Sequence, residues 1–204
     1  SRFTEVTLPS RLELAYTITQ WGNNGVGFAQ IKTFYQIFDK NTALTAVNVE
    51  EGGLYFASDD GIVYEVNADG VADTVLYCPP AKTGDVTIPK EVVMVEYGAF
   101  ANTSVSSVTF EEYPKEHENY GQPLLSLGNG YLNVTYQNPG TGYAVFSLAN
   151  GTGNLTSIKL PSHLQKLGIN VFNNLHKAGT TITFNPDAKI EAIEGRAIQN
   201  CNIT

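Results

Sequence analysis

The sequence predicts a mainly β protein in which short strands, joined by turns and short helical or 3-10 segments, stack into a right-handed solenoid. Three observations support this fold class. A segment of roughly 20 to 29 residues recurs along the chain, its apolar positions alternate as strand residues do, and turn-forming residues such as its 19 glycines are spread over the whole length.

The clearest copy of the repeat runs from Leu155 to Asn174. A second copy lies 72 positions earlier, where Asn102 takes the place of Asn174. The matched apolar positions are Leu160, Leu164, Leu167, Ile158 and Phe172 in one copy and Ile88, Val92, Val95, Val86 and Phe100 in the other. Such self-similarity is typical of a leucine-rich solenoid.

The first repeat opens with Thr4–Pro9, and its second half is displaced by an irregular insert over residues 16–33. This insert contains Trp21 within a Gly- and Asn-rich loop, and Phe38 is the candidate for the aromatic position that follows. The next strand is expected at residues 44–49, where Leu44, Val47 and Val49 repeat the apolar spacing.

Residues 54–80 carry a different pattern, in which short apolar runs are separated by Asp60-Gly61 and Asp69-Gly70. Asp-Gly between alternating runs is a strong hairpin signal. We therefore expect β-hairpins that project from the solenoid.

A second irregular insert covers residues 111–143, and its first part, through Gln122, has the composition of a solvated loop. Leu124, Leu127 and Leu132 fit the places of Val92, Val95 and Phe100, but Phe146 competes with Leu132 for the aromatic position, so the register there stays open. Phe172 and Ile198 then continue the repeat at equal spacing. We expect one solenoid domain over 1–204, as a fragment of a longer protein or with its last coil covered by a following domain.

Alternation along each strand places one polar residue between two buried ones. These middle residues should line the exposed face of one sheet, which is our candidate partner-binding face: Thr7, Asn48, Thr87, Thr109, Lys159 and Thr183. Three asparagines, Asn102, Asn174 and Asn200, follow the aromatic position, either as a buried stack that satisfies turn backbone groups or as exposed turn residues.

Composition and charge exclude several classes of partner. The formal net charge is −8 and no basic cluster is present, which argues against nucleic acid. The two cysteines, Cys78 and Cys201, lack the spacing of a metal site or disulfide framework. No apolar run is long enough to insert into a membrane, and no signal peptide is present in this chain.

The sequence contains no recognisable catalytic, metal or cofactor motif, so we do not expect an enzyme. His117, His163 and His176 lack the partners of a triad or zinc site and are interpreted as surface residues. An acidic loop contains four glutamates but supplies no cleft for a glycosidase pair: Glu111, Glu112, Glu116 and Glu118. The Asp-Gly and Gly-rich segments are interpreted as turns.

Two features of the chain are distinctive: the repeated Ile/Val-x-Ile/Leu-Pro, Val/Leu-x-x-Val/Leu, Ala-Phe-x-Asn pattern, and the segment over residues 60–89. Together they resemble the BspA-like leucine-rich repeat proteins of bacterial surfaces. The resemblance is tight over 84–110 and 154–201. It implies a secreted or cell-surface protein, extracellular display, and adhesion or protein recognition, with no catalytic residues to carry over.

The leading hypothesis is a binding module whose exposed sheet face meets a host or cell-surface protein, helped by loop anchors at Trp21, Tyr113 and Tyr120. Trp21 can equally cap the first coil. The alternatives are a carbohydrate-binding or glycosidase-associated module that uses the same aromatic residues to hold polysaccharide, and a passive surface spacer.

Overall fold

The computed structural model describes residues 3–13, 17–20, 27–30, 37–38, 41–128, 144–147, 153–172, 175 and 179–203. Regular structure within these ranges is almost all strand, with helical or 3-10 residues only at 37–38 and 175. The mainly β prediction is therefore confirmed. Within the same ranges, no helix is long and apolar enough to cross a membrane.

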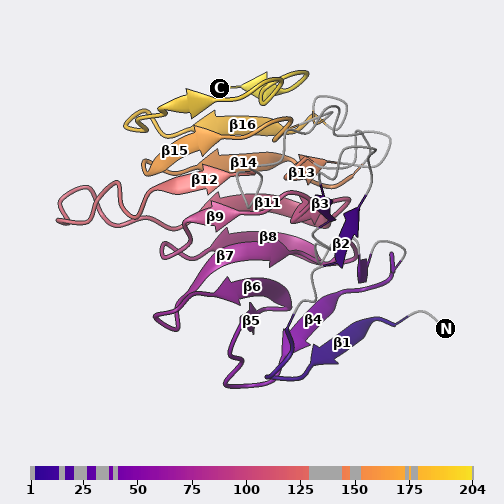
Figure 1. The fold of residues 1–204 in the computed structure, drawn as a ribbon. Coiled ribbons are helices and arrows are strands. Elements are labelled where there is room, and N and C mark those ends of the chain that lie inside the picture. The colour runs from indigo at the N-terminus through magenta and orange to yellow at the C-terminus, as the bar shows by residue number, and fades with distance from the viewer. Residues whose placement is uncertain are drawn as a thin grey trace.

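Five strands from successive repeats form one parallel sheet (Figure 1). Val86 pairs with Val108, Val108 with Ile158, and Ile158 with Ile182, so the predicted equivalence of Val86 and Ile158 is confirmed. In spatial order the strands of this five-stranded sheet are β8 (Thr83–Ile88), β11 (Ser104–Phe110), β14 (Ser157–Leu160), β16 (Thr181–Phe184) and β18 (Asn202–Ile203).

The second half of each repeat contributes to a seven-stranded sheet. Its repeat strands also pair in parallel and in chain order. They are β9 (Met94–Val95), β12 (Leu125–Leu127), β15 (Leu164–Leu167) and β17 (Ala192–Ile193). The chain thus alternates between two stacks of parallel strands, which is the arrangement that a leucine-rich-repeat solenoid requires.

The aromatic position forms a third stack. Strand β10 (Phe100–Ala101) pairs in parallel with β13 (Phe146–Ser147). The Phe146 ring lies between those of Phe100 and Phe172, with centroid distances of 5.1 and 5.7 Å. Inward residues of both sheets and these rings share one buried cluster, because alternation turns every second strand residue toward it.

The structure resolves the register that the sequence left open between residues 111 and 146. Leu127 pairs with Val95 as expected, and Phe146 holds the aromatic position opposite Phe100. Leu124 does not take the expected core position, because its side chain is 42% exposed. Leu125 is buried instead and pairs with Leu164, next to a register shift that the repeat spacing could not reveal. Leu132 lies outside the described residues.

The hairpins expected at residues 54–80 form, but they extend the seven-stranded sheet instead of projecting from it. Strands β5 (Phe56–Asp59), β6 (Ile62–Val66) and β7 (Ala72–Tyr77) pair antiparallel, and β7 pairs in parallel with β9. Ile62 and Tyr64 enter the main cluster, whereas Val63 enters a second one. Because both faces of β6 are buried, these strands cannot stand free in solvent.

The second cluster lies under the N-terminal strands. Strand β1 (Glu5–Leu8) pairs in parallel with β4 (Ala46–Val49) as a separate two-stranded sheet. The predicted aromatic Phe38 packs against Tyr77, with 5.5 Å between ring centroids. Within the first predicted insert, β2 (Thr17–Gln20) and β3 (Gly27–Gln30) pair antiparallel. Trp21 lies outside the described residues.

The asparagines after the aromatic position are turn residues and not a buried stack. Asn102 and Asn200 are exposed and adopt positive φ angles of 58° and 56°. Asparagine tolerates this left-handed conformation better than most residues. The backbone conformation therefore explains their recurrence; Asn174 lies outside the described residues.

The last repeat leaves three isoleucines exposed, each at the end of a buried column. Ile203 pairs with Ile182 and is 46% exposed, and Ile193 pairs with Leu167 and is 55% exposed. Ile198, at the aromatic position of its repeat, is 40% exposed. The apolar core is therefore open at this end of the described chain.

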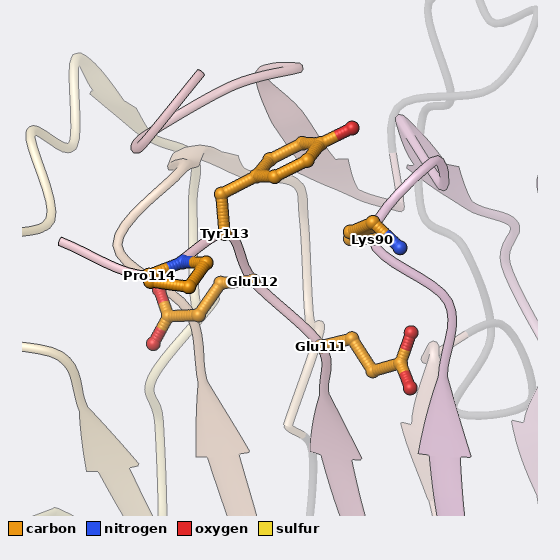
Figure 2. Close-up of a pocket in the computed structure, with 5 residues that line it drawn as sticks. All are labelled: Lys90, Glu111, Glu112, Tyr113 and Pro114. Carbon is orange, nitrogen blue, oxygen red and sulfur yellow. The ribbon is translucent and has the colours of Figure 1, made fainter. Parts of the chain in front are cut away.

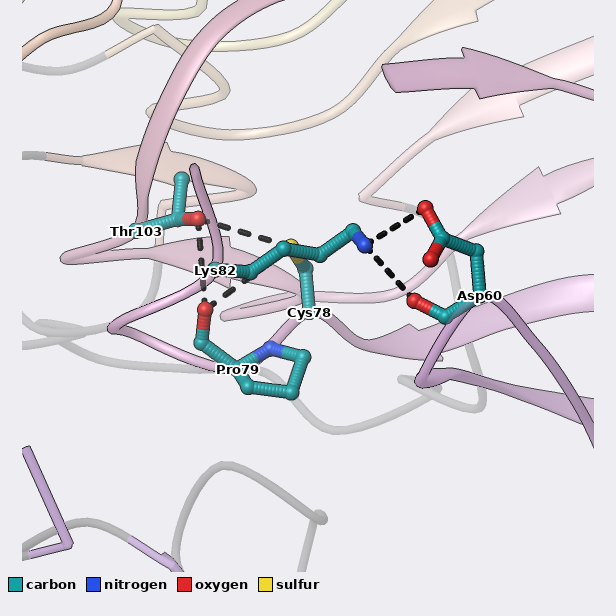
Figure 3. A network of polar contacts seen from close by, with 5 residues as sticks. All are labelled: Asp60, Cys78, Pro79, Lys82 and Thr103. Atoms are coloured by element: carbon teal, nitrogen blue, oxygen red, sulfur yellow. Dashed lines mark hydrogen bonds and ion pairs between the residues drawn. The ribbon is translucent and has the colours of Figure 1, made fainter. Parts of the chain in front are cut away.

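A buried lysine ties the turn between β5 and β6 to the loop before β8 (Figure 3). The Lys82 ammonium donates to the Asp60 carbonyl oxygen at 2.7 Å and to its carboxylate at 2.6 Å. The Lys82 side chain is 9% exposed, whereas that of Asp60 is 81% exposed. Solvent around Asp60 screens the charge pair. The electrostatic attraction between Lys82 and Asp60 is therefore weaker than that of a fully buried ion pair.

We expect Asp60→Asn to lower the free energy of unfolding by about 1–2 kcal/mol, because it leaves a buried ammonium without its counter-charge. Asparagine still suits the positive φ of 46° at this position. Lys82→Met should cost less, since it removes the buried charge together with the pair. Urea denaturation of both variants checks this order, and a larger loss in Lys82→Met would contradict it.

Candidate interaction surface

Four residues of the predicted partner-binding face stand in one row across the five-stranded sheet. Thr87 pairs with Thr109, Thr109 with Lys159, and Lys159 with Thr183. Thr87, Lys159 and Thr183 are exposed and Thr109 is half-buried. The other two predicted residues, Thr7 and Asn48, pair with each other in the separate N-terminal sheet. The six residues therefore form two groups.

A second polar row, missed in the sequence analysis, runs parallel to the first. Its members pair across the same strands two positions earlier: Asp85, Ser107, Ser157 and Thr181. The Ser107 hydroxyl donates to the Asp85 carboxylate at 2.7 Å. Period-two alternation could have identified this row, since residues two apart share a face.

The two rows together define what we call the hydroxyl face: Asp85, Thr87, Ser107, Thr109, Ser157, Lys159, Thr181 and Thr183. Its rows are about 6.6 Å apart along each strand, and neighbouring strands are about 4.8 Å apart, as in any sheet. The residues between the rows, such as Val108 and Ile158, are fully buried. The face is thus polar and backed by the buried core.

An ordered segment over residues 111–122, which we call the strap, borders this face. The Glu112 carboxylate accepts a hydrogen bond from the Ser162 backbone N–H at 2.8 Å and one from the Asn185 side-chain amide at 3.0 Å. One carboxylate therefore joins the chain after β11 to the turns after β14 and β16. Most residues of the strap are exposed, as its composition predicted, and its carboxylate at Glu112 links it to two neighbouring turns.

The two described loop-anchor candidates are already engaged within the chain. The Tyr113 ring stacks on His117 with 4.5 Å between centroids, and the Lys90 ammonium lies 5.5 Å from the Tyr113 ring centroid. The Tyr120 hydroxyl donates to Asp187 at 2.8 Å. Trp21, the third candidate, lies outside the described residues.

Asp187 is a second attachment point of the strap. Its carboxylate also pairs with Lys115 at 2.6 Å. The hydrogen bonds from Lys115 and Tyr120 stabilise the ionised carboxylate and hold the pKa of Asp187 below its ordinary value.

A shallow depression of about 330 Å³ opens beside the strap (Figure 2). It is lined by Lys90, Glu111, Glu112, Tyr113 and Pro114. In Figure 2 the carboxylates of the adjacent Glu111 and Glu112 point in different directions. Because Glu112 is bonded to two neighbouring turns, this arrangement does not supply the paired carboxylates of a glycosidase cleft.

The histidines do not share the surface position that the sequence suggested. His117 is exposed, but His163 is only 2% exposed and lies in the turn between β14 and β15. Nothing in the sequence around Pro161 and Ser162 indicates that His163 is buried. His176 lies outside the described residues. In the described part of the chain, no group of three or more His, Cys, Asp or Glu residues could hold a metal ion.

Comparison with known proteins supports the repeat assignment. The model of the BspA type leucine rich repeat region matches residues 77–121 and 144–204 in 6 copies, just over half of the chain. No curated protein matches the chain. A crystal structure of a leucine rich cell surface protein from Faecalibacterium prausnitzii is 17% identical, with a TM-score of 0.39, over 78% of this chain and 44% of that one. This chain spans less than half of the length of that protein. Because the family model covers the repeats whose strands stack in the structure, the chain belongs to the BspA-type leucine-rich repeat family.

Proposed function

We propose that the chain is a non-catalytic binding module of an extracellular or cell-surface protein, and that it recognises a protein partner through the hydroxyl face. The observation that carries this proposal is the alignment of two polar rows on a sheet whose opposite side is core. Short Ser and Thr side chains lose little conformational entropy when they are covered. Their hydroxyls both donate and accept hydrogen bonds, which suits the polar groups of a protein surface.

A protein partner is favoured over polysaccharide by the state of the aromatic side chains. The polysaccharide hypothesis relies on ring faces or hydroxyls that are available to a ligand. In the described residues, Tyr113 is stacked on His117 and the Tyr120 hydroxyl is bonded to Asp187. Among the described strands, the hydroxyl face itself contains no aromatic residue.

The test compares the wild-type chain with a variant that carries Thr109→Arg and Lys159→Glu. Both substitutions lie in the centre of the hydroxyl face, on paired positions. Binding is measured by biolayer interferometry against purified extracellular proteins, and in parallel on a glycan array. The wild type should bind a protein, and the variant should bind it at least about tenfold more weakly, which corresponds to about 1.4 kcal/mol.

The matched control is Asp69→Arg, an exposed change of charge in the turn between β6 and β7. It should bind within about twofold of the wild type, since it lies away from the hydroxyl face. Binding to glycans alone that is lost in Tyr113→Ala would instead support the carbohydrate hypothesis. Equal binding by wild type and face variant would contradict the proposal, and absence of any binding by the wild type would support a spacer.

A further inference from the structure

His163 occupies a turn where three repeats are joined. Its backbone carbonyl accepts a hydrogen bond from the Leu125 N–H at 2.8 Å, which links the turn to β12. The preceding N–H, that of Ser162, donates to Glu112 in the strap, and Glu112 also binds Asn185 in the next repeat. Opening of this turn would therefore break the bond between Ser162 and the strap, while the bonds of the strap to Asn185 and Asp187 stay in place.

The imidazole of His163 is buried, and one of its two ring nitrogens has no hydrogen-bond partner in the described structure. The residue is 2% exposed, and its Nδ1 atom has no hydrogen-bond partner within the described structure; the adjacent Ser162 hydroxyl has none there either. A protonated imidazole must donate from both nitrogens. The closed turn offers Nδ1 no acceptor, so a proton there would be poorly solvated.

Two effects act on the charge of His163, and they oppose each other. Burial is the larger and lowers the pKa of His163 below its ordinary value, whereas the negative charge of Glu112 raises it. Within the described residues, Glu112 is the charged group that acts on this imidazole. Burial prevails, so the closed turn favours neutral imidazole.

We propose that the turn containing Ser162 and His163 is a pH-sensitive latch, which joins β12 and the strap to the end of β14 at neutral pH and opens when His163 is protonated under mildly acidic conditions. The latch is separate from the hydroxyl face and does not depend on the proposed function. Its open state exposes the imidazole to water and frees the Ser162 and Leu125 amides from their acceptors.

The direction in which pH changes the stability of the closed turn follows from proton linkage. An exposed imidazole takes up a proton near pH 6.5, and the buried one does so only at lower pH. The open state therefore binds more protons in the interval between the two values. The closed state keeps its full stability above about pH 6.5 and loses stability as the pH falls toward the lower pKa.

Amide hydrogen exchange, followed by NMR at pH 7, 6 and 5 and corrected for intrinsic exchange rates, tests the latch on the intact chain. The opening constants of Ser162 and Leu125 should rise as the pH falls, by at most about tenfold for each unit between the open and closed pKa values. His163→Gln should abolish this rise, and His117→Gln should keep it. An unchanged pH dependence in His163→Gln would overturn the proposal.

A second measurement keeps the proposal testable if His163→Gln fails to fold. The imidazole resonance of His163 in the wild type is titrated. His163 should titrate below the ordinary histidine value of about 6.5, and a midpoint at or above that value would refute the latch. An effect that arises at Glu112 is distinguishable, because it persists in His163→Gln.

Discussion

Phe146→Ala is expected to lower the free energy of unfolding by about 3–5 kcal/mol, the range for truncating a buried aromatic residue. Phe146 is fully buried and is the central ring of the three-ring stack, so it loses ring contacts on two sides. Each stacked pair contributes about 0.5–1.5 kcal/mol beyond the area that it buries. Alanine would leave a cavity between repeats that the paired strands β10 and β13 cannot close.

Guanidinium denaturation with a fluorescence or circular-dichroism readout measures this loss. Phe3→Ala is the matched control, because Phe3 is 61% exposed and its truncation should change stability by less than about 0.5 kcal/mol. A loss below about 1.5 kcal/mol for Phe146→Ala would show that this ring does not hold the repeats together.

Gly168→Ala is expected to lower the free energy of unfolding by about 2–3 kcal/mol, at the upper end of the cost of overpacking. Gly168 follows β15, and a Cβ atom there would overlap the carbonyl oxygen of Gly128 and lie 2.8 Å from the Tyr97 hydroxyl. That hydroxyl accepts a hydrogen bond from the Ile169 N–H at 3.2 Å. The obstacle includes backbone of the neighbouring repeat, so rotation of one side chain cannot remove it.

Gly195→Ala is the control for this substitution. No atom lies within 4 Å of a Cβ built at Gly195, and its φ is not in the left-handed region. Alanine there should be neutral, or stabilising by up to about 1 kcal/mol through the unfolded state. Thermal and urea denaturation compare the two variants directly, and equal stabilities would show that the close approach at Gly168 is unimportant.

The sequence was sufficient to predict the repeat strands, because burial acts there with a regular period. Ile158 and Val86 fall in register since each strand places its apolar residues toward the same core. The polar residues between them, such as Thr109 and Lys159, follow from the same alternation. Their role in binding remains a prediction.

Contacts between repeats were not predictable in the same way, because they depend on how loops cross the sheet edges. Nothing local in Glu112 distinguishes it from Glu111, yet it accepts bonds from two neighbouring turns. His163 is likewise buried, although nothing in its local sequence indicates burial. Asp-Gly turns predicted the hairpins at residues 54–80. The pairing of β7 with β9 was not predicted, because it depends on apolar surface on both faces of a strand.

The open end of the core bears on how the molecule would respond to mechanical load. Ile193, Ile198 and Ile203 lie against one neighbouring repeat, whereas the corresponding positions farther back lie between two. In an array held by nearest-neighbour interfaces, a pull on the C-terminal strand separates one such interface at a time. Under load the stacked repeats would therefore separate in a series of small steps, one interface after another.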